Sequence, residues 1–567
     1  MPNTRAVAAA VAVPSDRQMA ADVTIAGTIT YDCVPVVVSR DAQGRLQAKL
    51  DYDATARYAV ASAVVMVIDP DTRRVLADTL SDVAGAYALA VPPNVRAMVR
   101  VEARMMSADI APDGRPAWEV AVRDNHSEEF RVVPEQATVY ALESEPFDTG
   151  AHGRTVALHA GSGWSRDLQR YPATRPAAPF AILAAVHQAI QCVLAVDRAA
   201  VFAPLNVFWH PHNVPETRNP HQEGATPDDP LERLSRGYIG TSFFKVTPPG
   251  SGIYLLGAQN VDTDEYHPAT IIHEWAHYFE NVFSRADNGG GAHEEHPDMR
   301  SGFTEAWANA LSSIVRGTPV YATTCGQKQA STGAAFDLDE IGTPRTWYGE
   351  MPISHALYQW AKSAHIGFQP IYDVMVNDQR RVGAFTSLLS FATRLRKRVG
   401  VAGQGEIDRM LRALNTVDGA ALDEWGTRQR VLPADIVAPQ DQRFVLPIYT
   451  ELTLDEPSPP LCLTDKFNRS EAGKASRGCV GNRRFLRFTL VRRGNYRVVG
   501  EVVPSGPQNL PLPYFDLYLD GTRIAHDPAD ANGWVYYDLP PATYAAEIYP
   551  AAQQPLAGCF RFTLKKA

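Results

Sequence analysis

The sequence predicts a multidomain protein in which a central α+β unit lies between an N-terminal β-sandwich and a C-terminal β-rich unit. The chain has 567 residues, which is more than a single hydrophobic core organises. Apolar residues alternate at the strand period towards both ends, whereas they recur at helical spacing through much of the middle. We therefore place the three units at residues 23–143, 147–440 and 461–567.

The composition is that of an ordinary globular protein, with 45% hydrophobic and 21% charged residues. The net charge of −9 argues against a nucleic-acid partner, because phosphate binding needs a surplus of Lys and Arg on one face. The sequence contains no run of about 18 apolar residues, so we expect no membrane span. None of these patterns predicts the oligomeric state.

Residues 1–22 form a leader or a weak signal segment. Arg5 precedes the Ala-rich apolar run 6–13, which is typical of a short signal peptide. Gln18 makes the junction between Ala20 and Ala21 a poor cleavage site. We expect a secreted or periplasmic protein, and a cytoplasmic leader is the alternative.

The first β-rich unit is defined by short strands and turns. Residues 64–68 form an apolar strand, and Asp82 and Gly85 then lead into Tyr87, Leu89 and Val91, which alternate at the strand period before two prolines. This pattern, D-x-x-G-x-Y-x-L-x-V-P between strands, resembles the carboxypeptidase regulatory-like family. The resemblance covers about 80 residues and implies a small β-sandwich.

A Pro-rich connector (447–460) precedes the last unit and predicts a boundary that few contacts cross. The segments 516–521 (DLYLDG) and 539–550 (LPPATYAAEIYP) resemble the bacterial pre-peptidase C-terminal domain, which implies a jelly-roll-like module. Three of the six cysteines lie in this quarter. In an exported protein a bridge between Cys462 and Cys479 is expected, and free buried thiols are the alternative.

The chemistry is carried by the segment from Ile271 to Phe279, which contains His273-Glu274-Trp275-Ala276-His277. Histidines at i and i+4 lie one turn apart on the same helix face, where they can share one zinc ion. Glu274 is turned about 100° around the helix axis, where it can reach water at the metal. The motif therefore predicts zinc ligands and a general base on one helix.

A third ligand is needed to complete a catalytic zinc site. Glu305 lies on a second predicted helix with a continuous apolar stripe, so its carboxylate can be held in place. His293 and His296 compete for this role, but the glycines at 289–291 would place them on a loop. We favour Glu305, with Asn309 one turn further along the same face.

The two helices together resemble the gluzincins, the thermolysin-like HExxH…E zinc peptidases, over residues 170–375. The sequence is similar to uncharacterised bacterial secreted peptidases with the same flanking modules. The resemblance implies a zincin-like fold for the central unit, zinc held by His273, His277 and Glu305, and Glu274 as catalytic base. Asn309 replaces the acidic residue that orients a ligand imidazole in that family, which puts metal affinity in doubt but not the metal class.

Other candidates are less specific. Gluzincins add a Tyr or His that stabilises the oxyanion, and Tyr348, His355 and Tyr358 are the candidates here, although each is also explained by a structural role. Asp262, Asp264 and Glu265 either cap the motif helix or bind calcium. The strand 252–257 is either the edge strand that holds an extended peptide or an ordinary core strand. His210 and His212 resemble a pair of metal ligands, but the proline between them favours a loop.

These observations predict a zinc-dependent peptidase acting on a protein or peptide substrate, with zinc, and in addition calcium, as the candidate metals. The first alternative is a catalytically silent adhesin or polymer-binding protein built from β-modules. The second is a zinc hydrolase that acts on a non-peptide amide. The intact Glu274 and the complete ligand set favour the peptidase over the first alternative, and they fit the second equally well.

Overall fold

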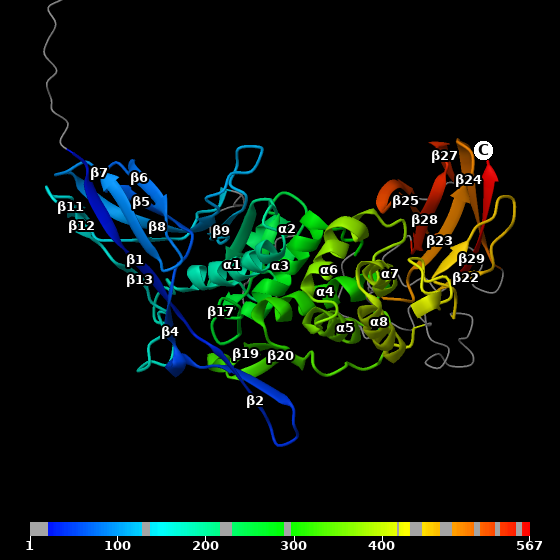
Figure 1. The fold of residues 1–567 in the computed structure, drawn as a ribbon, viewed down its shortest axis with the longest axis horizontal. Helices are drawn as coiled ribbons and strands as arrows, with labels where there is room; N and C mark the ends of the chain where they lie inside the picture. The colour runs from blue at the N-terminus through cyan, green and yellow to red at the C-terminus, as the bar shows by residue number, and fades with distance from the viewer. Residues whose placement is uncertain are drawn as a thin grey trace, which may run out of the picture.

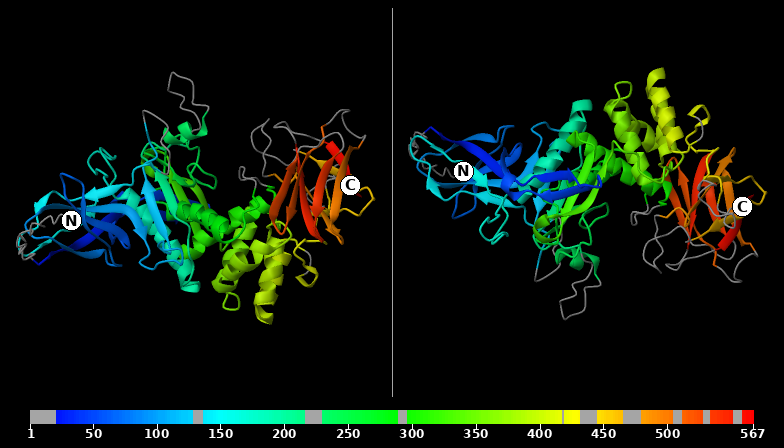
Figure 2. Two further views of the ribbon diagram at one scale, coloured as in Figure 1. Left: turned by 90° about the horizontal axis from the view of Figure 1, so that it is seen from above. Right: turned by 90° about the horizontal axis from the view of Figure 1, so that it is seen from below.

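The computed structural model describes residues 21–127, 136–215, 229–288, 296–416, 419–430, 445–464, 479–503, 511–527, 533–550 and 558–567. Strands gather at the two ends of an elongated molecule and helices fill its middle, as Figure 1 and Figure 2 show. The expected multidomain architecture with β-rich ends is therefore confirmed at this level.

The elements follow one another in three groups. The first is β1 (Val23–Cys33), β2 (Val36–Arg40), β3 (Leu46–Leu50), β4 (Ala56–Ala59), β5 (Ala63–Ile68), β6 (Val75–Leu80), β7 (Ala86–Val91), β8 (Arg96–Met106), β9 (Glu119–Arg123), β10 (Ala141–Glu143), β11 (Phe147–Asp148), β12 (Arg154–Thr155) and β13 (Leu158–Ala160). The second is α1 (Ala178–Val196), β14 (Leu205–Trp209), α2 (Pro230–Ser235), β15 (Phe243–Lys245), β16 (Gly252–Leu255), β17 (Gly257–Ala258), β18 (Asp262–Thr263), α3 (Pro268–Phe283), α4 (Met299–Arg316), β19 (Val320–Cys325), β20 (Ser331–Asp337), α5 (Glu350–Lys362), α6 (Phe368–Asp373), α7 (Leu388–Arg398) and α8 (Val401–Ala413). The third is β21 (Tyr449–Glu451), β22 (Leu461–Leu463), β23 (Arg484–Leu490), β24 (Gly494–Val502), β25 (Tyr514–Leu519), β26 (Thr522–Asp527), β27 (Trp534–Leu539), β28 (Ala542–Tyr549) and β29 (Gly558–Lys566).

Apart from β2 and β3, which form a two-stranded sheet of their own, the N-terminal strands belong to two sheets that share one core. In the first sheet, β12, β1 and β13 are neighbours, and β4 and β7 also pair with β1. In β7, Tyr87, Leu89 and Val91 are buried and the residues between them are more exposed, so the predicted alternation is confirmed. The boundary predicted between the N-terminal and central units, at 143–147, falls between β10 and β11. Both strands pair with β8, so this boundary divides strands of one sheet.

The second sheet runs on from the N-terminal strands into the central unit, in the order β15-β16-β14-β9-β8-β5-β6. β14 is parallel to both β9 and β16, so three parallel strands lie side by side. β16 is fully buried and has a neighbour on each side, which makes it a core strand. The edge-strand interpretation of 252–257 is therefore wrong, and β15 is the edge of this sheet in the described residues.

The helices of the central unit pack on this sheet and on one another. α3 packs against α4, α4 packs against α5, and α1 lies on α3 and on β1, β8 and β9. Of the helices in the described part of the chain, α1 alone has the length and hydropathy that a membrane span requires. Its apolar stripe, including Ile182, Val186 and Ile190, is buried inside the protein, which is the position of a core helix.

The C-terminal unit contains two facing sheets, β21-β23-β28-β25-β26 and β22-β29-β24-β27, which enclose a core of their own. A disulfide joins Cys462 in β22 to Cys559 in β29, which are direct partners in an antiparallel pair. The expected bridge between Cys462 and Cys479 is therefore wrong. The sequence favoured the nearer cysteine, whereas strand pairing brings the distant one within a Cα–Cα distance of 4.0 Å.

The C-terminal unit is not separated from the centre by the Pro-rich connector. Ile448, Tyr449, Val480 and Phe485 belong to the same hydrophobic cluster as the helices of the central unit. Arg300 at the start of α4 forms a buried ion pair, as described below, with a carboxylate of β28. The expectation that few contacts cross this boundary is therefore wrong, because the strands after the connector bury their outer face on the helices.

Candidate metal centre

The motif helix α3 begins where the sequence predicts. Pro268 occupies its first turn, where the missing N–H costs nothing. His267 precedes it and is fully buried, with Nδ1 at 2.8 Å from Asp264 Oδ1 and Nε2 at 2.8 Å from Thr324 Oγ1. This hydrogen-bonded chain ties the first turn of α3 to β19 and fixes where the helix starts.

Three candidate ligands converge between α3 and α4. His273 Nε2 and His277 Nε2 are 3.2 Å apart, and Glu305 Oε2 lies 3.2 Å from the first and 3.4 Å from the second. The two imidazole rings are nearly perpendicular, at 84°. The structure thus brings the three predicted metal ligands into one group that could hold a metal ion.

The orientation of His273 is set by a chain of polar contacts behind it. Its Nδ1 lies 2.9 Å from Asn309 Oδ1, and Asn309 Nδ2 donates to Glu350 Oε1 at 2.8 Å. Because the Nδ2 atom donates to Glu350, the amide oxygen faces the ring, and the ring nitrogen beside it carries the proton. Nε2 of His273 therefore presents a lone pair to His277 and Glu305, as a metal ligand must.

Charge and burial act in opposite directions within the group. Burial alone would raise the pKa of the Glu305 carboxyl, but the two histidines hold it well below its usual range. Burial alone would lower the pKa of His277, but the Glu305 carboxylate raises it to about 9. A cation bound between these side chains would replace the proton of His277 as the positive charge that stabilises the Glu305 carboxylate.

Glu274 is buried beside the ligands without being one of them. It is 7% exposed, and its pKa is raised by burial, while His273 and His277 act to lower it. A buried carboxyl with a raised pKa close to a metal-ligand set has the properties of a general base or acid.

The candidate oxyanion residues have other partners. The Tyr348 hydroxyl lies 3.1 Å from His296 Nδ1, next to the start of α4. His355 Nδ1 lies 2.9 Å from the Leu338 carbonyl oxygen, and the Tyr358 ring lies 5.0 Å from Lys362 Nζ. None of these contacts involves the histidine–glutamate group, so the role assigned to the three residues stays a prediction without support from their surroundings.

The structure also shows the surroundings of His296, the rival for the third-ligand role, and of the candidate calcium ligands. His296 contacts Tyr348 and, through its carbonyl oxygen, Val480 N, whereas His293 lies outside the described residues. Glu265 forms a buried ion pair with Arg175, with Nη1 and Oε1 2.5 Å apart. Asp264 contacts Ser242 and His267, and Asp262, Asp264 and His267 form a group that could hold a metal ion. The calcium site remains a prediction.

Three residues near the centre were missed by the sequence analysis. The Tyr321 ring, from β19, lies edge-on to His273 with ring centroids 6.2 Å apart. Glu350, at the start of α5, holds Asn309, and Glu280, on α3, is fully buried with burial raising its pKa to about 8. The sequence carries no signal for the first two, because their proximity depends on how separate elements pack. Glu280 follows His277 by three residues and could have been found from its helix face.

Comparisons with known proteins add little to this geometry. No family model matches the chain. No curated protein matches it either. A solved pre-peptidase C-terminal domain of a collagenase from Bacillus anthracis is 12% identical and covers 21% of this chain and 94% of that domain, with a TM-score of 0.15. A 9R-lipoxygenase from Cyanothece is 9% identical and covers 33% of this chain and 26% of that one, with a TM-score of 0.12. At such TM-scores neither likeness indicates a function.

Proposed function

We propose that this chain is a zinc-dependent peptidase of the gluzincin type, in which His273, His277 and Glu305 hold the metal. The observation that carries the proposal is the mutual distance of the three ligand atoms, 3.2, 3.2 and 3.4 Å. Atoms bound about 2.0–2.1 Å from a tetrahedral zinc ion lie roughly 3.3 Å from one another. Two imidazoles and one carboxylate at this spacing fit zinc in both chemistry and size.

When bound, zinc would supply Lewis acidity towards a carbonyl oxygen and towards water. Glu274 accepts a proton from the attacking water and returns it to the leaving amine. Its burial favours this exchange, because a raised pKa brings the carboxyl closer to neutral pH. Asn309 and Glu350 hold the His273 ring in one tautomer while the charge at the centre changes.

The sheet beside the motif helix offers a place for an extended substrate. β15 is the edge of the nine-stranded sheet in the described residues, and Phe244 in β15 meets the ring of Tyr278 on α3 at 6.0 Å. An extended peptide can add to such an edge by main-chain hydrogen bonds. We assign the substrate-strand role to β15 in place of the segment 252–257.

The proposal is tested by separating metal binding from proton transfer. Glu274→Gln removes the base but none of the three ligands, so zinc content should equal that of the wild type while peptide hydrolysis falls by about 10²–10⁴-fold or more. Casein and a peptide library, each with and without a chelator, provide the assay. Glu280→Gln is the matched control, because it neutralises another buried carboxyl on the same helix and should leave turnover within a few-fold.

Two outcomes would overturn the proposal. One is a Glu274→Gln variant that keeps more than a few per cent of wild-type turnover. The other is wild-type hydrolysis that survives complete removal of zinc. Hydrolysis of small amides without any cleavage of peptides would instead assign the same centre to a non-peptide substrate.

A further inference from the structure

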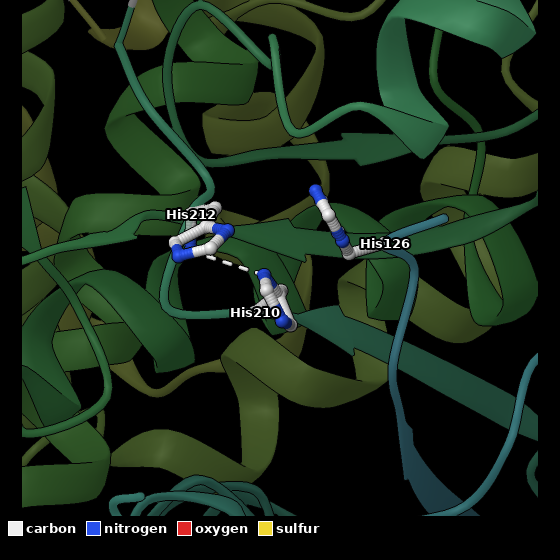
Figure 3. A group of neighbouring side chains, drawn as sticks. All are labelled: His126, His210 and His212. Atoms are coloured by element: carbon white, nitrogen blue, oxygen red, sulfur yellow. Dashed lines mark hydrogen bonds between the residues drawn. The ribbon is translucent and has the colours of Figure 1, made fainter. Parts of the chain in front are cut away.

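A second group of histidines lies at the edge of the sheet that joins the N-terminal and central units. His126 follows β9, whereas His210 and His212 follow β14, and these two strands are parallel neighbours. The carboxyl ends of parallel strands meet at one edge, which is where open α/β sheets place ligand sites. The three rings face one another there, as Figure 3 shows.

The two loops that carry these histidines are locked together by a buried pair of amides. Asn125 and Asn213 exchange two hydrogen bonds, each 3.0 Å long, and are 2% and 0% exposed. Each amide nitrogen also donates to a backbone carbonyl oxygen, that of Leu234 at 2.8 Å and that of Leu255 at 2.9 Å. Because His126 and His212 are the sequence neighbours of this pair, their backbones are held at a fixed separation.

The ring nitrogens are close enough to share an ion. One nitrogen from each of the three rings lies within 4.8 Å of the others. His126 and His210 stack with centroids 4.4 Å apart, and His212 meets both rings nearly at right angles. His126 and His210 are half-buried while His212 is exposed, so the group is open to solvent on one side.

The electrostatics favour a neutral ring at His210. Burial, with smaller contributions from the neighbouring His126 and His212, lowers the pKa of His210 to about 3. A neutral imidazole is the form that binds a metal. Asp124 accepts a hydrogen bond from His126 N at 2.9 Å and places a carboxyl group near the rings.

We propose that His126, His210 and His212 form a second metal site, which binds zinc or a similar late first-row divalent ion. Three imidazoles without a thiolate suit such ions, whereas calcium and magnesium require oxygen ligands. Three protein ligands leave a fourth position for water. The bound ion crosslinks the loop after β9 and the loop after β14, and so connects the N-terminal strands to the central unit.

Binding requires one local change. His210 Nδ1 accepts a hydrogen bond from His212 N at 3.1 Å, so the proton of the neutral ring is on Nε2. Coordination by His210 breaks this bond, either because Nδ1 binds the ion or because the proton moves to Nδ1 and Nε2 binds it. The amide of His212 should therefore exchange its hydrogen faster in the metal-loaded protein than in the metal-free protein.

The site is tested in the full chain after the first centre has been removed. The double variant His273→Ala with His277→Ala is loaded with zinc sulfate, passed through a desalting column, and analysed for metal. It should retain about one zinc per chain, and zinc should raise its melting temperature. Adding His212→Ala should remove both the metal and the shift in melting temperature. His212 is exposed, so this change leaves the core intact, and His152→Ala, at another exposed histidine, is the matched control.

The inference is independent of the peptidase proposal, because neither the loading nor the melting experiment measures hydrolysis. It is overturned if the double variant holds no zinc at micromolar concentrations. It is also overturned if the bound zinc survives both His212→Ala and a separate His126→Ala change. A triple variant that loses the metal but retains the folded spectrum and cooperative melting of its parent supports the site.

Discussion

The two histidine groups differ in the elements that hold their ligands. His273, His277 and Glu305 come from two packed helices, and their ligand atoms lie 3.2–3.4 Å apart. His126, His210 and His212 come from loops at a sheet edge, and His210 Nδ1 accepts a hydrogen bond from His212 N. The helical group has the spacing of a zinc site without any ion, whereas the loop group must break this hydrogen bond before His210 can coordinate an ion.

This difference indicates different roles. A site whose ligands are already at bonding distances loses little energy to rearrangement, which suits a centre where bond making depends on fixed geometry. A site that must rearrange before it coordinates its ion gains rigidity only when the ion binds, which suits a structural role. We therefore expect the first centre to govern turnover and the second to govern stability.

The largest expected effect is the loss of the first centre through its third ligand. Glu305→Ala should remove about one zinc per chain and abolish hydrolysis, because two histidines alone hold zinc poorly. The second site should keep its metal. Zinc analysis with a peptide assay checks both, and His296→Ala is the control that should change neither. If Glu305→Ala kept the zinc of the first centre while His296→Ala lost it, the ligand assignment would fall.

The next effect concerns the contact that holds α4. Arg300 is 2% exposed and pairs with Asp298. Its guanidinium donates two hydrogen bonds to the Glu547 carboxylate of β28, at 2.7 and 2.8 Å. Glu547→Gln leaves Arg300 buried with one counter-charge fewer, so the free energy of unfolding should fall by about 3 kcal/mol.

The position of this contact makes the effect selective. Arg300 lies in the first turn of α4, five residues before Glu305, so zinc affinity at the first centre should fall as well. Affinity at the second site should not change. Denaturant unfolding and zinc titration measure these quantities. The control is Glu451→Gln, because Glu451 pairs with Arg487 on the surface and should contribute at most about 1 kcal/mol. Equal effects of the two changes would contradict the buried interface.

A smaller effect is expected from the residue behind His273. Asn309→Ala frees the imidazole to turn, and zinc affinity at the first centre should fall about 10–100-fold. Asn309→Asp keeps an acceptor for the ring N–H and should retain more of that affinity. Zinc titration with a competing chelator checks this order of affinities, in which Asn309→Asp lies between the wild type and Asn309→Ala. If Asn309→Ala bound zinc as tightly as the wild type, the hydrogen bond would not position the ligand.

The last expected effect is a change in the pH dependence of stability in the metal-free protein. Burial raises the pKa of Glu280 to about 8, far above its value in an unfolded chain. The folded state therefore keeps this proton when the unfolded state has released it, so stability falls as pH rises from about 5 to 8, by at most about 1.4 kcal/mol per unit. Glu280→Gln should remove this part of the slope. Unfolding curves of the wild type and of Glu280→Gln at pH 5, 6, 7 and 8 measure this slope. If the stability of both proteins depended on pH in the same way, the Glu280 carboxyl would titrate normally.

The sequence predicts the first group well because its ligands lie on two regular helices. The spacing of His273 and His277 and the apolar stripe around Glu305 are visible without a structure. Glu350 and Tyr321 are not, because they reach the centre from α5 and β19 through tertiary packing. The second group was not predicted from the sequence for the same reason. His210 and His212 were noted as a loop pair, but only the pairing of β14 with β9 brings His126 beside them.

Strand order also explains the errors in the fold. The alternation in β7 correctly predicted a strand, but sequence alone does not indicate which strands become neighbours. Thus 252–257 was correctly interpreted as apolar and strand-like, yet β15 covers it. The cysteine pairing failed similarly, since β29 lies beside β22 despite its distance along the chain.

The parallel pairing of β9 with β14 has a consequence during synthesis. Val120 and Val122 on β9 are matched by Leu205 and Val207 on β14. As the chain leaves the ribosome, β9 can pair with β8, but it is made long before β14 and exposes one unpaired apolar edge until that later strand arrives. The N-terminal sheet therefore cannot be completed cotranslationally on its own. Its maturation waits for residues beyond Trp209, and nascent chains that stop before that point should be prone to aggregation or chaperone capture.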